Sequence, residues 1–296
     1  MSRPFVLGTR GSALALAQVE LVKQALNIAG VVADIQIKKI TTSGDRRSDF
    51  SAELESGAGV KGLFTKEIET ALLDGSIDVA VHSCKDLPGH LAGGLEIAAT
   101  LERADTADVY IGRTPFCDLD DRSAVGTSSV RRRRQLLWKN PCLVLEEMRG
   151  NVPTRIEKLR ASDSLSGIVL ARAGLDRLRL GLDEWIVEDL PILPAIGQGA
   201  IALECRSGDT AAAELLAKIN HAATFTCIRA ERELLRLLNG DCHLPVGAAT
   251  KIEDDVLSME AIIFGEEGEP PRTGKVAGSK NEPEKIAAEL FKSISS

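Results

Sequence analysis

Near the amino terminus, segments whose hydrophobic residues have the spacing of a strand are followed by segments with the spacing of a helix. The apolar stretch Phe5–Leu7 precedes Ser12, a good helix cap, and apolar residues then recur at helical spacing until Gly30. The same pattern predicts a strand over Ile35–Thr41, a helix over Leu63–Leu73 closed by Gly75, and a buried strand over Ile77–Val81. Strands that alternate with helices predict a mainly parallel sheet.

The alternation of predicted strands and helices begins again after Arg103. It predicts strands over Val109–Gly112, Ala124–Val125, Leu143–Leu145 and Ile168–Ala171, a helix ending at Trp138 and a helix beginning at Val152. We therefore predict a second α/β lobe of similar size.

Prolines and glycines between Pro191 and Gly199 indicate a crossing of the chain. A strand over Ala200–Glu204 and a helix over Thr210–Ile219 follow it, and we expect both to return to the first sheet. From Ala222 the pattern predicts a helix to Leu238, strands around Val246–Phe264 and a final helix over Pro283–Ile294.

The predicted fold class is therefore α/β, with two lobes that each hold a mainly parallel sheet and a small α+β carboxy-terminal domain. The predicted domains are residues 1–102 with 195–220, residues 103–194, and residues 221–296. Two such lobes leave a cleft, and open parallel sheets bind ligands outside the carboxyl ends of their strands.

Composition excludes several classes of protein. The 296 residues carry a net charge of -7 and only seven Phe, two Trp and one Tyr, which disfavours nucleic-acid binding. We find no apolar run long enough for a membrane span and no export signal, so we expect a cytoplasmic protein. The six cysteines are scattered singly and are interpreted as reduced thiols.

Polar motifs follow two strands of the first lobe. Arg10 and Ser12 stand between the first strand and its helix, where helix N–H groups favour an anion, although Arg10 could instead cap its own loop. Lys85 and Asp86 follow the strand Ile77–Val81 and place a cation beside a carboxylate, although they could also form a simple surface pair.

The second lobe carries two basic motifs in the same position relative to its strands. Residues 126–135 read Gly-Thr-Ser-Ser-Val-Arg-Arg-Arg-Arg-Gln and suit a small, multiply anionic ligand, although they could form a solvated helix face. Asn151 can cap a helix that projects Arg155, which follows Arg149 and Gly150. Arg177 either adds a further guanidinium or lies on a helix surface.

Two overlapping glycine-rich segments lie between residues 44 and 62. Residues 57–62 match G-x-G-x-x-G but follow a polar loop instead of a strand, so we do not interpret them as a dinucleotide site. Residues 44–62 are better interpreted as a flap with Lys61 at its base. The alternative is a surface loop without a role.

Cys242 lies in a turn, where a thiol is accessible, although a lone Cys usually serves packing. The sequence contains none of the common metal-binding motifs.

Together these motifs resemble the porphobilinogen deaminase (hydroxymethylbilane synthase) family. The resemblance runs in order through Thr9-Arg10-Gly-Ser12, Lys61-Gly-Leu-Phe-Thr-Lys-Glu, His82-Ser-Cys-Lys85-Asp86-Leu-Pro, Gly126-Thr-Ser-Ser-Val-Arg131-Arg132, Arg149-Gly-Asn-Val-Pro-Thr-Arg155, Leu193-Pro-Ala-Ile-Gly-Gln-Gly-Ala and Gly240-Asp-Cys242-His-Leu-Pro. Each motif alone is weak evidence for this family, whereas seven of them in the same order are specific for it. One departure is Asp241, where the family usually has a second glycine before the cysteine.

The resemblance implies a three-domain fold like that of periplasmic binding proteins and a transferase reaction. Four porphobilinogens lose ammonia through an azafulvenium cation and join into a linear tetrapyrrole, primed by a dipyrromethane on a thioether to Cys242. The implied catalytic residue is Asp86. The implied cofactor contacts are Lys85, Asp86, Thr127, Ser128, Ser129, Arg131, Arg132, Arg149 and Gly150, and the implied substrate contacts are Arg10, Ser12, Lys61, Arg155 and Arg177.

The expected partner is a small-molecule substrate, with no nucleic acid or membrane, and the expected state is a monomer. The alternative function is a non-enzymatic, two-lobed binding protein for an anionic metabolite, which would need neither Cys242 nor Asp86.

Overall fold

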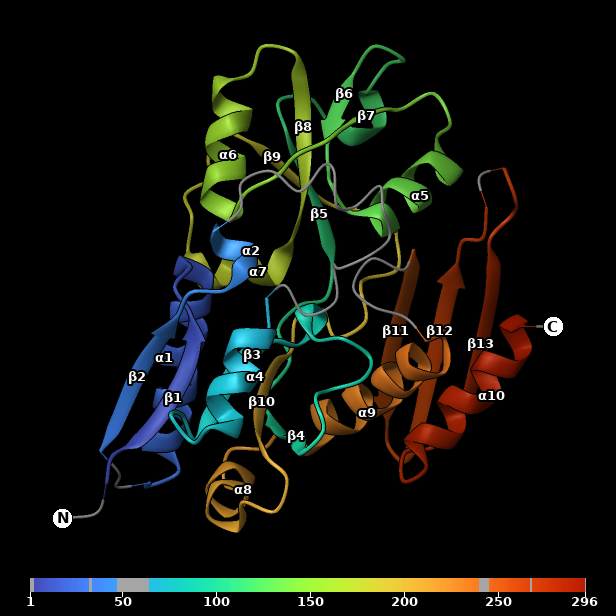
Figure 1. The fold of residues 1–296 in the computed structure, drawn as a ribbon. Helices are drawn as coiled ribbons and strands as arrows, with labels where there is room; N and C mark the ends of the chain where they lie inside the picture. Colours follow the sequence, from blue (N-terminus) through green and yellow to red (C-terminus); the bar gives the residue numbers. More distant parts are fainter. Residues whose placement is uncertain (1–2, 32–33, 47–63, 240–244, 267, 296) are drawn as a thin grey trace. The chain divides into compact units, whose positions relative to one another are not determined.

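The computed structural model describes residues 3–31, 34–46, 64–239, 245–266 and 268–295. The chain divides into two compact units, whose elements are labelled in Figure 1. Unit 1 is built mainly from residues 1–103 and 200–228, and unit 2 from residues 104–199, 229–238 and 243–296. The chain therefore leaves unit 1 after Arg103 and returns to it after Gly199.

Unit 1 contains a five-stranded sheet in the order β2-β1-β3-β10-β4. Its elements are β1 (Phe5–Arg10), α1 (Ala13–Ile28), β2 (Ile35–Ile40), α2 (Ser43–Arg46), α4 (Lys66–Leu73), β3 (Val79–Ser83), the 3-10 turn η1 (Cys84–Asp86), β4 (Leu95–Thr100), β10 (Ile201–Arg206) and α8 (Thr210–Ala217). Strand β1 is parallel to β2 and β3, and β10 is antiparallel to β3 and β4. Four strands therefore point one way, and β10 alone is reversed.

Helices cover both faces of this sheet. Buried residues of α1 recur at helical spacing, among them Val19, Val22 and Leu26, and they pack with α8 against one face of the sheet. On the other face, Ile68 and Leu72 of α4 pack with Ile77, Ala80 and Leu95. Unit 1 is thus a three-layer α/β/α body with its core on both sides of β3.

Unit 2 contains a sheet of the same design, in the order β7-β6-β8-β5-β9. Its elements are β5 (Asp108–Gly112), η2 (Phe116–Asp118), β6 (Ala124–Gly126), α5 (Val130–Lys139), β7 (Val144–Glu146), α6 (Val152–Ala161), β8 (Leu165–Ala171), α7 (Arg172–Leu178) and β9 (Ile186–Asp189). Strand β6 is parallel to β7 and β8, whereas β5 is antiparallel to β8 and β9. The reversed strand again occupies the fourth position.

Hydrophobic side chains pack on both faces of this second sheet as well. Ile156 and Leu159 of α6 and Leu175 of α7 pack on one face, and Leu136 of α5 packs on the other. Tyr110 is fully buried, and its hydroxyl donates to the carbonyl of Ser166 at 2.9 Å.

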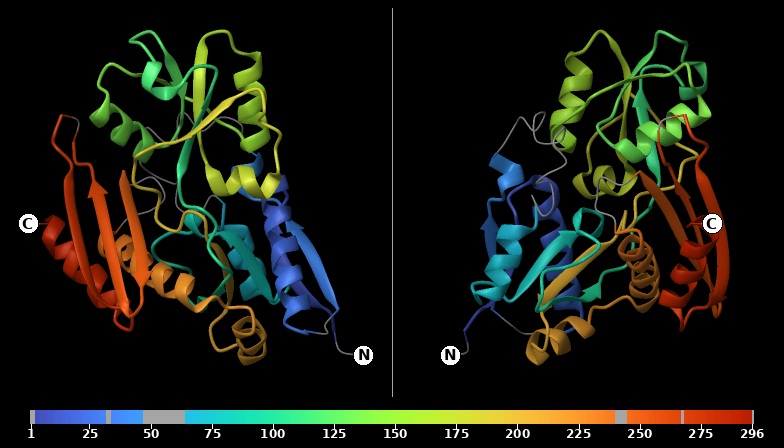
Figure 2. Two further views of the ribbon diagram at one scale, coloured as in Figure 1. Left: turned by 180° about the vertical axis from the view of Figure 1, so that it is seen from behind. Right: turned by 45° about the vertical axis from the view of Figure 1, so that its right-hand side comes forward.

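Residues beyond α9 (Ala222–Leu237) form a three-stranded antiparallel sheet and a helix. The elements are β11 (Val246–Glu253), β12 (Val256–Ile263), β13 (Arg272–Ser279) and α10 (Pro283–Ser295). Every second residue of β12 is buried, and α10 lies against the sheet with Ile286, Leu290 and Ile294 buried, as Figures 1 and 2 show. This part of the chain is α+β.

The fold class predicted from sequence is confirmed. Ser12 caps α1, since its Oγ accepts from the amide of Ala15 at 3.2 Å, and β10 joins the first sheet as expected. The predicted strand over Ile77–Val81 is shifted, because β3 begins at Val79 and includes His82. Strands β4, β9 and β13 and helix α7 were not predicted. Most of the predicted flap lies outside the described residues, and residues 43–46 form α2.

Gly199 occupies a position that only glycine fills without strain. Its φ is +85°, and a Cβ there would lie 2.4 Å from the carbonyl oxygen of Ala104. Gly208 also has a positive φ, of +80°, but a Cβ there would meet nothing within 4 Å.

We predict that Gly199→Ala lowers the free energy of unfolding by about 3 kcal/mol, from backbone strain plus overpacking. Gly208→Ala, the matched control, should cost only about 1 kcal/mol. Urea denaturation followed by circular dichroism measures both, and equal losses for the two variants would contradict the steric account.

Candidate functional site

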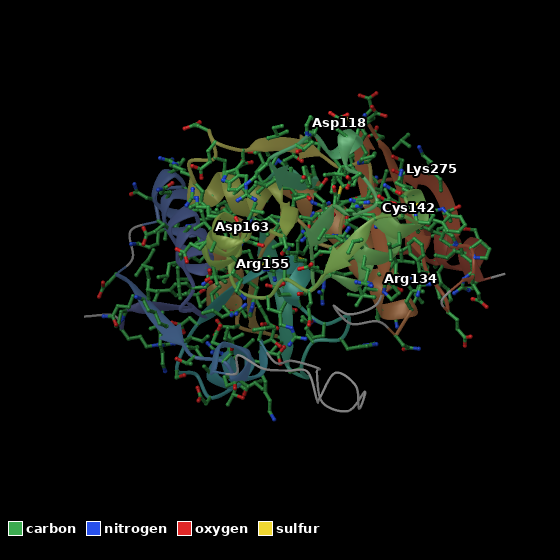
Figure 3. All side chains as sticks on the ribbon, turned by 90° about the horizontal axis from the view of Figure 1, so that it is seen from above. Asp118, Arg134, Cys142, Arg155, Asp163 and Lys275 are labelled. Atoms are coloured by element: carbon green, nitrogen blue, oxygen red, sulfur yellow. The ribbon has the colours of Figure 1, made fainter. Side chains whose placement is uncertain are left out.

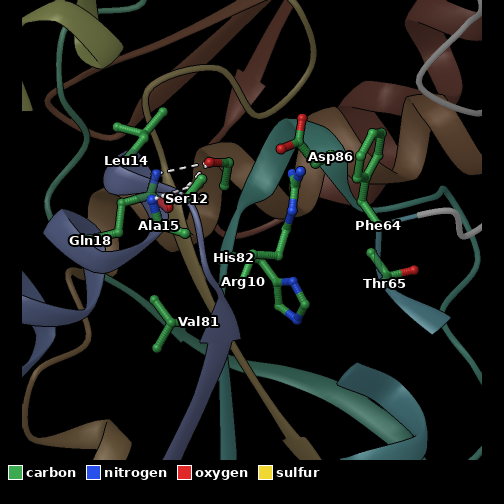
Figure 4. Close-up of a pocket in the computed structure, with 11 residues that line it drawn as sticks. Arg10, Ser12, Leu14, Ala15, Gln18, Phe64, Thr65, Val81, His82 and Asp86 are labelled. Atoms are coloured by element: carbon green, nitrogen blue, oxygen red, sulfur yellow. Dashed lines mark hydrogen bonds between the residues drawn. The ribbon is translucent and has the colours of Figure 1, made fainter. Parts of the chain in front are cut away.

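A pocket opens at the carboxyl ends of β1 and β3. These strands are parallel neighbours, so the residues that follow them meet at one edge of the sheet. The residues that line the pocket are Arg10, Ser12, Leu14, Ala15, Gln18, Phe64, Thr65, Val81, His82, Ser83 and Asp86 (Figure 4). The sequence-predicted residues Arg10, Ser12 and Asp86 are therefore brought together here.

Asp86 is held at this edge by its neighbours in η1. Cys84 and Leu87 are 2% and 1% exposed, and the amide of Cys84 donates to the carbonyl of Ala200 at 3.0 Å. These buried anchors leave Lys85 and Asp86 half-buried. A carboxylate in this setting is fixed in place, yet open to a ligand in the pocket.

Arg10 ends β1 and already has partners. Its Nη2 lies 2.6 Å from Oδ1 of Asp45, and its guanidinium lies 4.2 Å from the centre of the Phe64 ring. Burial raises the pKa of Asp45, but hydrogen bonds from Arg10 and Thr42 outweigh it, so this pKa lies below its usual value. An anionic ligand at Arg10 would share the guanidinium with Asp45.

Gln18 was missed by the sequence analysis. It is 1% exposed, and its Nε2 donates to Oγ of Ser83 at 2.8 Å, which ties α1 to the end of β3. The signal for it is a polar residue on the otherwise apolar face of α1.

Unit 2 places its polar motifs at the carboxyl ends of its own parallel strands. After β6, Oγ of Ser129 accepts from the amide of Arg132 at 3.4 Å, and the Ser129 amide donates to Oγ1 of Thr127 at 3.2 Å. The Oγ of Ser128 is buried and has no hydrogen-bond partner within the described part of the chain. The first turn of α5 is thus capped, with one hydroxyl left for a ligand.

Arg131 and Arg132 are buried against a carboxylate that the sequence analysis missed. Arg131 Nη1 lies 2.7 Å from Oδ2 of Asp108, and Arg132 Nε lies 2.8 Å from Oδ1. Gln198 donates to the same Oδ1 at 3.0 Å. Asp108 is fully buried at the start of β5, and each guanidinium is 5% exposed. The sequence feature that could have identified Asp108 is a single acidic residue directly before an apolar strand.

The electrostatics of this group are dominated by its two cations. Burial alone would raise the pKa of Asp108, but the charges of Arg132 and Arg131 outweigh it and hold that pKa well below its usual range. One ionised carboxylate thus balances two guanidiniums, and the group keeps a net positive charge.

Helix α6 adds a third guanidinium. Asn151 caps this helix by accepting from the amide of Thr154 at 3.0 Å, as predicted, and Arg155 Nε donates to the carbonyl of Gly150 at 2.7 Å. Burial and the charge of Arg132 lower the pKa of Arg155 to about 10. No carboxylate among the described residues pairs with Arg155. Figure 3 labels it, well apart in that view from the exposed Cys142.

Two other predicted arginines have protein partners. Arg149 Nη2 lies 2.6 Å from Oε1 of Glu147 at the surface. Arg177 Nη2 donates to the carbonyl of Gly199 at 2.6 Å, and burial lowers the pKa of Arg177. Arg177 therefore braces the crossing segment in this structure.

Three residues of the prediction lie outside the described part of the chain: Lys61, Asp241 and Cys242. The other five cysteines are free thiols, and burial raises the pKa of Cys205 to about 11. The described residues include no cluster of His, Cys, Asp or Glu suited to a metal ion, and no described helix has the length and apolar character of a membrane span.

Family models match nearly the whole chain. The model described as "Porphobilinogen deaminase, dipyromethane cofactor binding domain" matches residues 5–214. The model described as "Porphobilinogen deaminase, C-terminal domain" matches residues 225–295.

Curated relatives agree with these matches. Porphobilinogen deaminase of Syntrophomonas wolfei is 44% identical over 97% of this chain and 94% of its own length. The Moorella thermoacetica enzyme is 42% identical over 97% and 92%, and the Thermus thermophilus enzyme is 40% identical over 99% and 95%.

Likeness to solved structures is weaker. The BvgS VFT2 domain of Bordetella pertussis has a TM-score of 0.45 at 14% identity, covering 76% of this chain and 91% of its own. A periplasmic binding protein of Salmonella typhimurium with high arginine specificity has a TM-score of 0.44 at 13% identity, covering 74% and 92%.

We predict that Asp108→Asn lowers the free energy of unfolding by about 3–5 kcal/mol at pH 7, because two buried guanidiniums lose their counter-charge. Since the folded-state pKa of Asp108 is depressed, its stabilisation is full above the unfolded-state pKa of about 4 and is lost as the pH falls below it. The difference between wild type and variant should therefore shrink below about pH 4.

Urea denaturation at pH 7 and pH 3 measures this effect. Asp163→Asn, at an exposed position, is the matched control and should change stability by less than about 0.5 kcal/mol. An Asp108→Asn variant as stable as the control at pH 7 would show that the buried group does not depend on this carboxylate.

Proposed function

Because the chain belongs to the porphobilinogen deaminase family, we propose that its pocket and its buried arginines serve that family's reaction. The protein is a hydroxymethylbilane synthase, a transferase that joins four porphobilinogens with loss of ammonia. The near full-length match to deaminases carries this conclusion. A non-enzymatic binding protein is not favoured, since the matched relatives are named as enzymes.

We propose that Asp86 is the catalytic carboxylate. It lines the pocket with Arg10 and Ser12 and is anchored on both sides by buried neighbours. An ionised carboxylate there would stabilise the cation that forms when ammonia leaves, and it would accept hydrogen bonds from pyrrole N–H groups. Such stabilisation is strongest when the charge is fixed in advance and partly shielded from water.

The residues of unit 2 fit the dipyrromethane cofactor of this family. Its acetate and propionate groups are anions, and the group formed by Arg131, Arg132 and Asp108 keeps a net positive charge. The Ser128 hydroxyl is buried and has no hydrogen-bond partner among the described residues, so it is available to one of these anions. When bound, the cofactor supplies the pyrrole carbon to which the first substrate is joined.

Other contacts are proposed from the resemblance. Cys242 would hold the cofactor through a thioether, with Lys85, Thr127, Ser129, Arg149 and Gly150 as further cofactor contacts. Arg10, Ser12, Lys61, Arg155 and Arg177 would bind the substrate carboxylates. Arg155 has no carboxylate partner among the described residues, which supports its proposed role as a contact for a substrate carboxylate.

The domain organisation, location and oligomeric state are also proposals. We propose three domains, of residues 1–102 with 195–220, residues 103–194 and residues 221–296, and the three separate sheets support this division. We further propose a cytoplasmic monomer that binds neither nucleic acid nor membrane, in line with the net charge of -7.

We predict that the purified native protein exceeds its sequence mass by one dipyrrole, because the cofactor is covalent. Cys242→Ser should lack this excess, and Cys142→Ser, at an exposed cysteine, should keep it. Intact-mass spectrometry measures all three proteins, and an unmodified wild type would rule out the thioether.

We predict that Asp86→Asn lowers kcat by about 10³-fold with the fold retained, because the cation loses its counter-charge. Asp34→Asn, at an exposed position of the same unit, is the control and should turn over normally. Porphyrin absorbance after oxidation of the product reports the rate, and a near-normal kcat for Asp86→Asn would remove its catalytic role.

A further inference from the structure

A buried histidine lines the unit 1 pocket and is hydrogen-bonded to a buried carboxylate of the neighbouring strand. His82 of β3 lines the pocket together with Asp86, and its Nε2 lies 3.0 Å from Oε2 of Glu204 on β10. His82 is 5% exposed and Glu204 is fully buried. The pair is therefore shielded from bulk water and adjoins the pocket.

Strand pairing accounts for this contact. His82 is directly opposite Ala202 in the antiparallel pair of β3 and β10. Side chains two residues apart on a strand share a face, so Glu204 lies diagonally across from His82. The contact joins residues 122 positions apart, and it depends on the return of β10 to the first sheet.

Burial of the Glu204 carboxylate lowers the stability of the fold. Its Oε1 has no hydrogen-bond partner among the described residues, and His82 is the only partner of its Oε2 there. A buried carboxylate that is only half satisfied costs stability, and an apolar pair of similar volume would avoid that cost. The arrangement therefore points to a use for the charge.

Three other charged groups belong to elements near this pair. Glu69 of α4 approaches from the helix that packs on this face, and burial together with the charge of Glu204 raises the pKa of Glu69. Arg10 of β1 and Asp86 of η1 line the same pocket as His82, and the Arg10 side chain lies between Asp86 and the imidazole ring in the view of Figure 4. Of these groups, only Glu204 is hydrogen-bonded to His82 within the described residues, so Glu204 is the carboxylate that orients the imidazole.

The contact with Glu204 occupies one ring nitrogen of His82 and leaves the other without a partner among the described residues. An ionised Glu204 accepts from Nε2, and Nδ1 of His82 makes no hydrogen bond within the described part of the chain. A carboxylate that fixes one nitrogen of an imidazole makes the other nitrogen a proton acceptor.

We propose that His82, oriented by Glu204, takes up the proton that the attacking pyrrole carbon loses in each condensation. The proton reaches Nδ1 through Asp86 or through pocket water, so His82 is a positioning residue for the proton and does not touch the substrate. This inference rests on the proposed function.

Every bond and proton in one condensation is accounted for. The C–N bond of the substrate's ammonium group breaks and releases ammonia, a C–C bond forms at the pyrrole carbon, and the C–H bond of that carbon breaks. The proton moves to His82 and then leaves with the ammonia as ammonium. The imidazole is thereby neutral again before the next substrate binds.

His82→Gln tests the proposal in the cofactor-loaded protein, with loading verified by intact mass. Glutamine can still donate to Glu204 but cannot take up a proton. We expect kcat to fall by about 10²-fold with KM unchanged, and we expect the acidic limb of the kcat–pH profile to disappear. His221→Gln is the matched control, since His221 does not line the pocket, and it should leave rate and profile unchanged.

Glu204→Gln provides a second test that keeps the shape of the side chain. A neutral amide no longer stabilises the imidazolium, so the acidic limb should move to lower pH. This result decides the question if His82→Gln does not fold by circular dichroism.

The outcomes separate this inference from the proposed function. A wild type that makes no tetrapyrrole overturns both. An active wild type with a folded His82→Gln variant of equal kcat and unchanged acidic limb overturns the role of His82 alone, as does an unmoved limb in Glu204→Gln.

Discussion

The direction of the strands is the constraint on which both sites depend. In each five-stranded sheet four strands run one way, so the segments that follow β1 and β3, or β6 and β7, meet at one edge. Arg10 and Asp86 are brought together in unit 1 because their strands are parallel neighbours. In unit 2 the same rule brings together the turns that begin α5 and α6.

The reversed strands have a different task. Strand β10 follows the return of the chain to unit 1, and β5 follows its departure from that unit. Each carries a buried acid: Glu204 holds His82, and Asp108 holds Arg131 and Arg132. The polar groups at the parallel ends are thus oriented by carboxylates from the strand that runs the other way. Charge placed in this manner is fixed before a ligand arrives, which is what electrostatic catalysis requires.

Local features of the fold could be predicted from the sequence, and non-local ones could not. The caps at Ser12 and Asn151 were predictable because a cap acts within four residues of itself. Strands β4, β9 and β13 were missed because their apolar periodicity is weak and tertiary pairing defines them. The segments that carry Arg10, Asp86, Arg131 and Arg155 were identified from their motifs. The buried partners Gln18 and Asp108 were not, because contacts 65 and 23 residues apart leave no local pattern.

Catalysis by this chain is best measured through the stoichiometry of ammonia release. Incubation of the purified protein with porphobilinogen, with ammonia and linear tetrapyrrole quantified in the same sample, distinguishes an enzyme from a binding protein. We expect four ammonia molecules for each tetrapyrrole released. Retention of intact porphobilinogen without release of ammonia would contradict it.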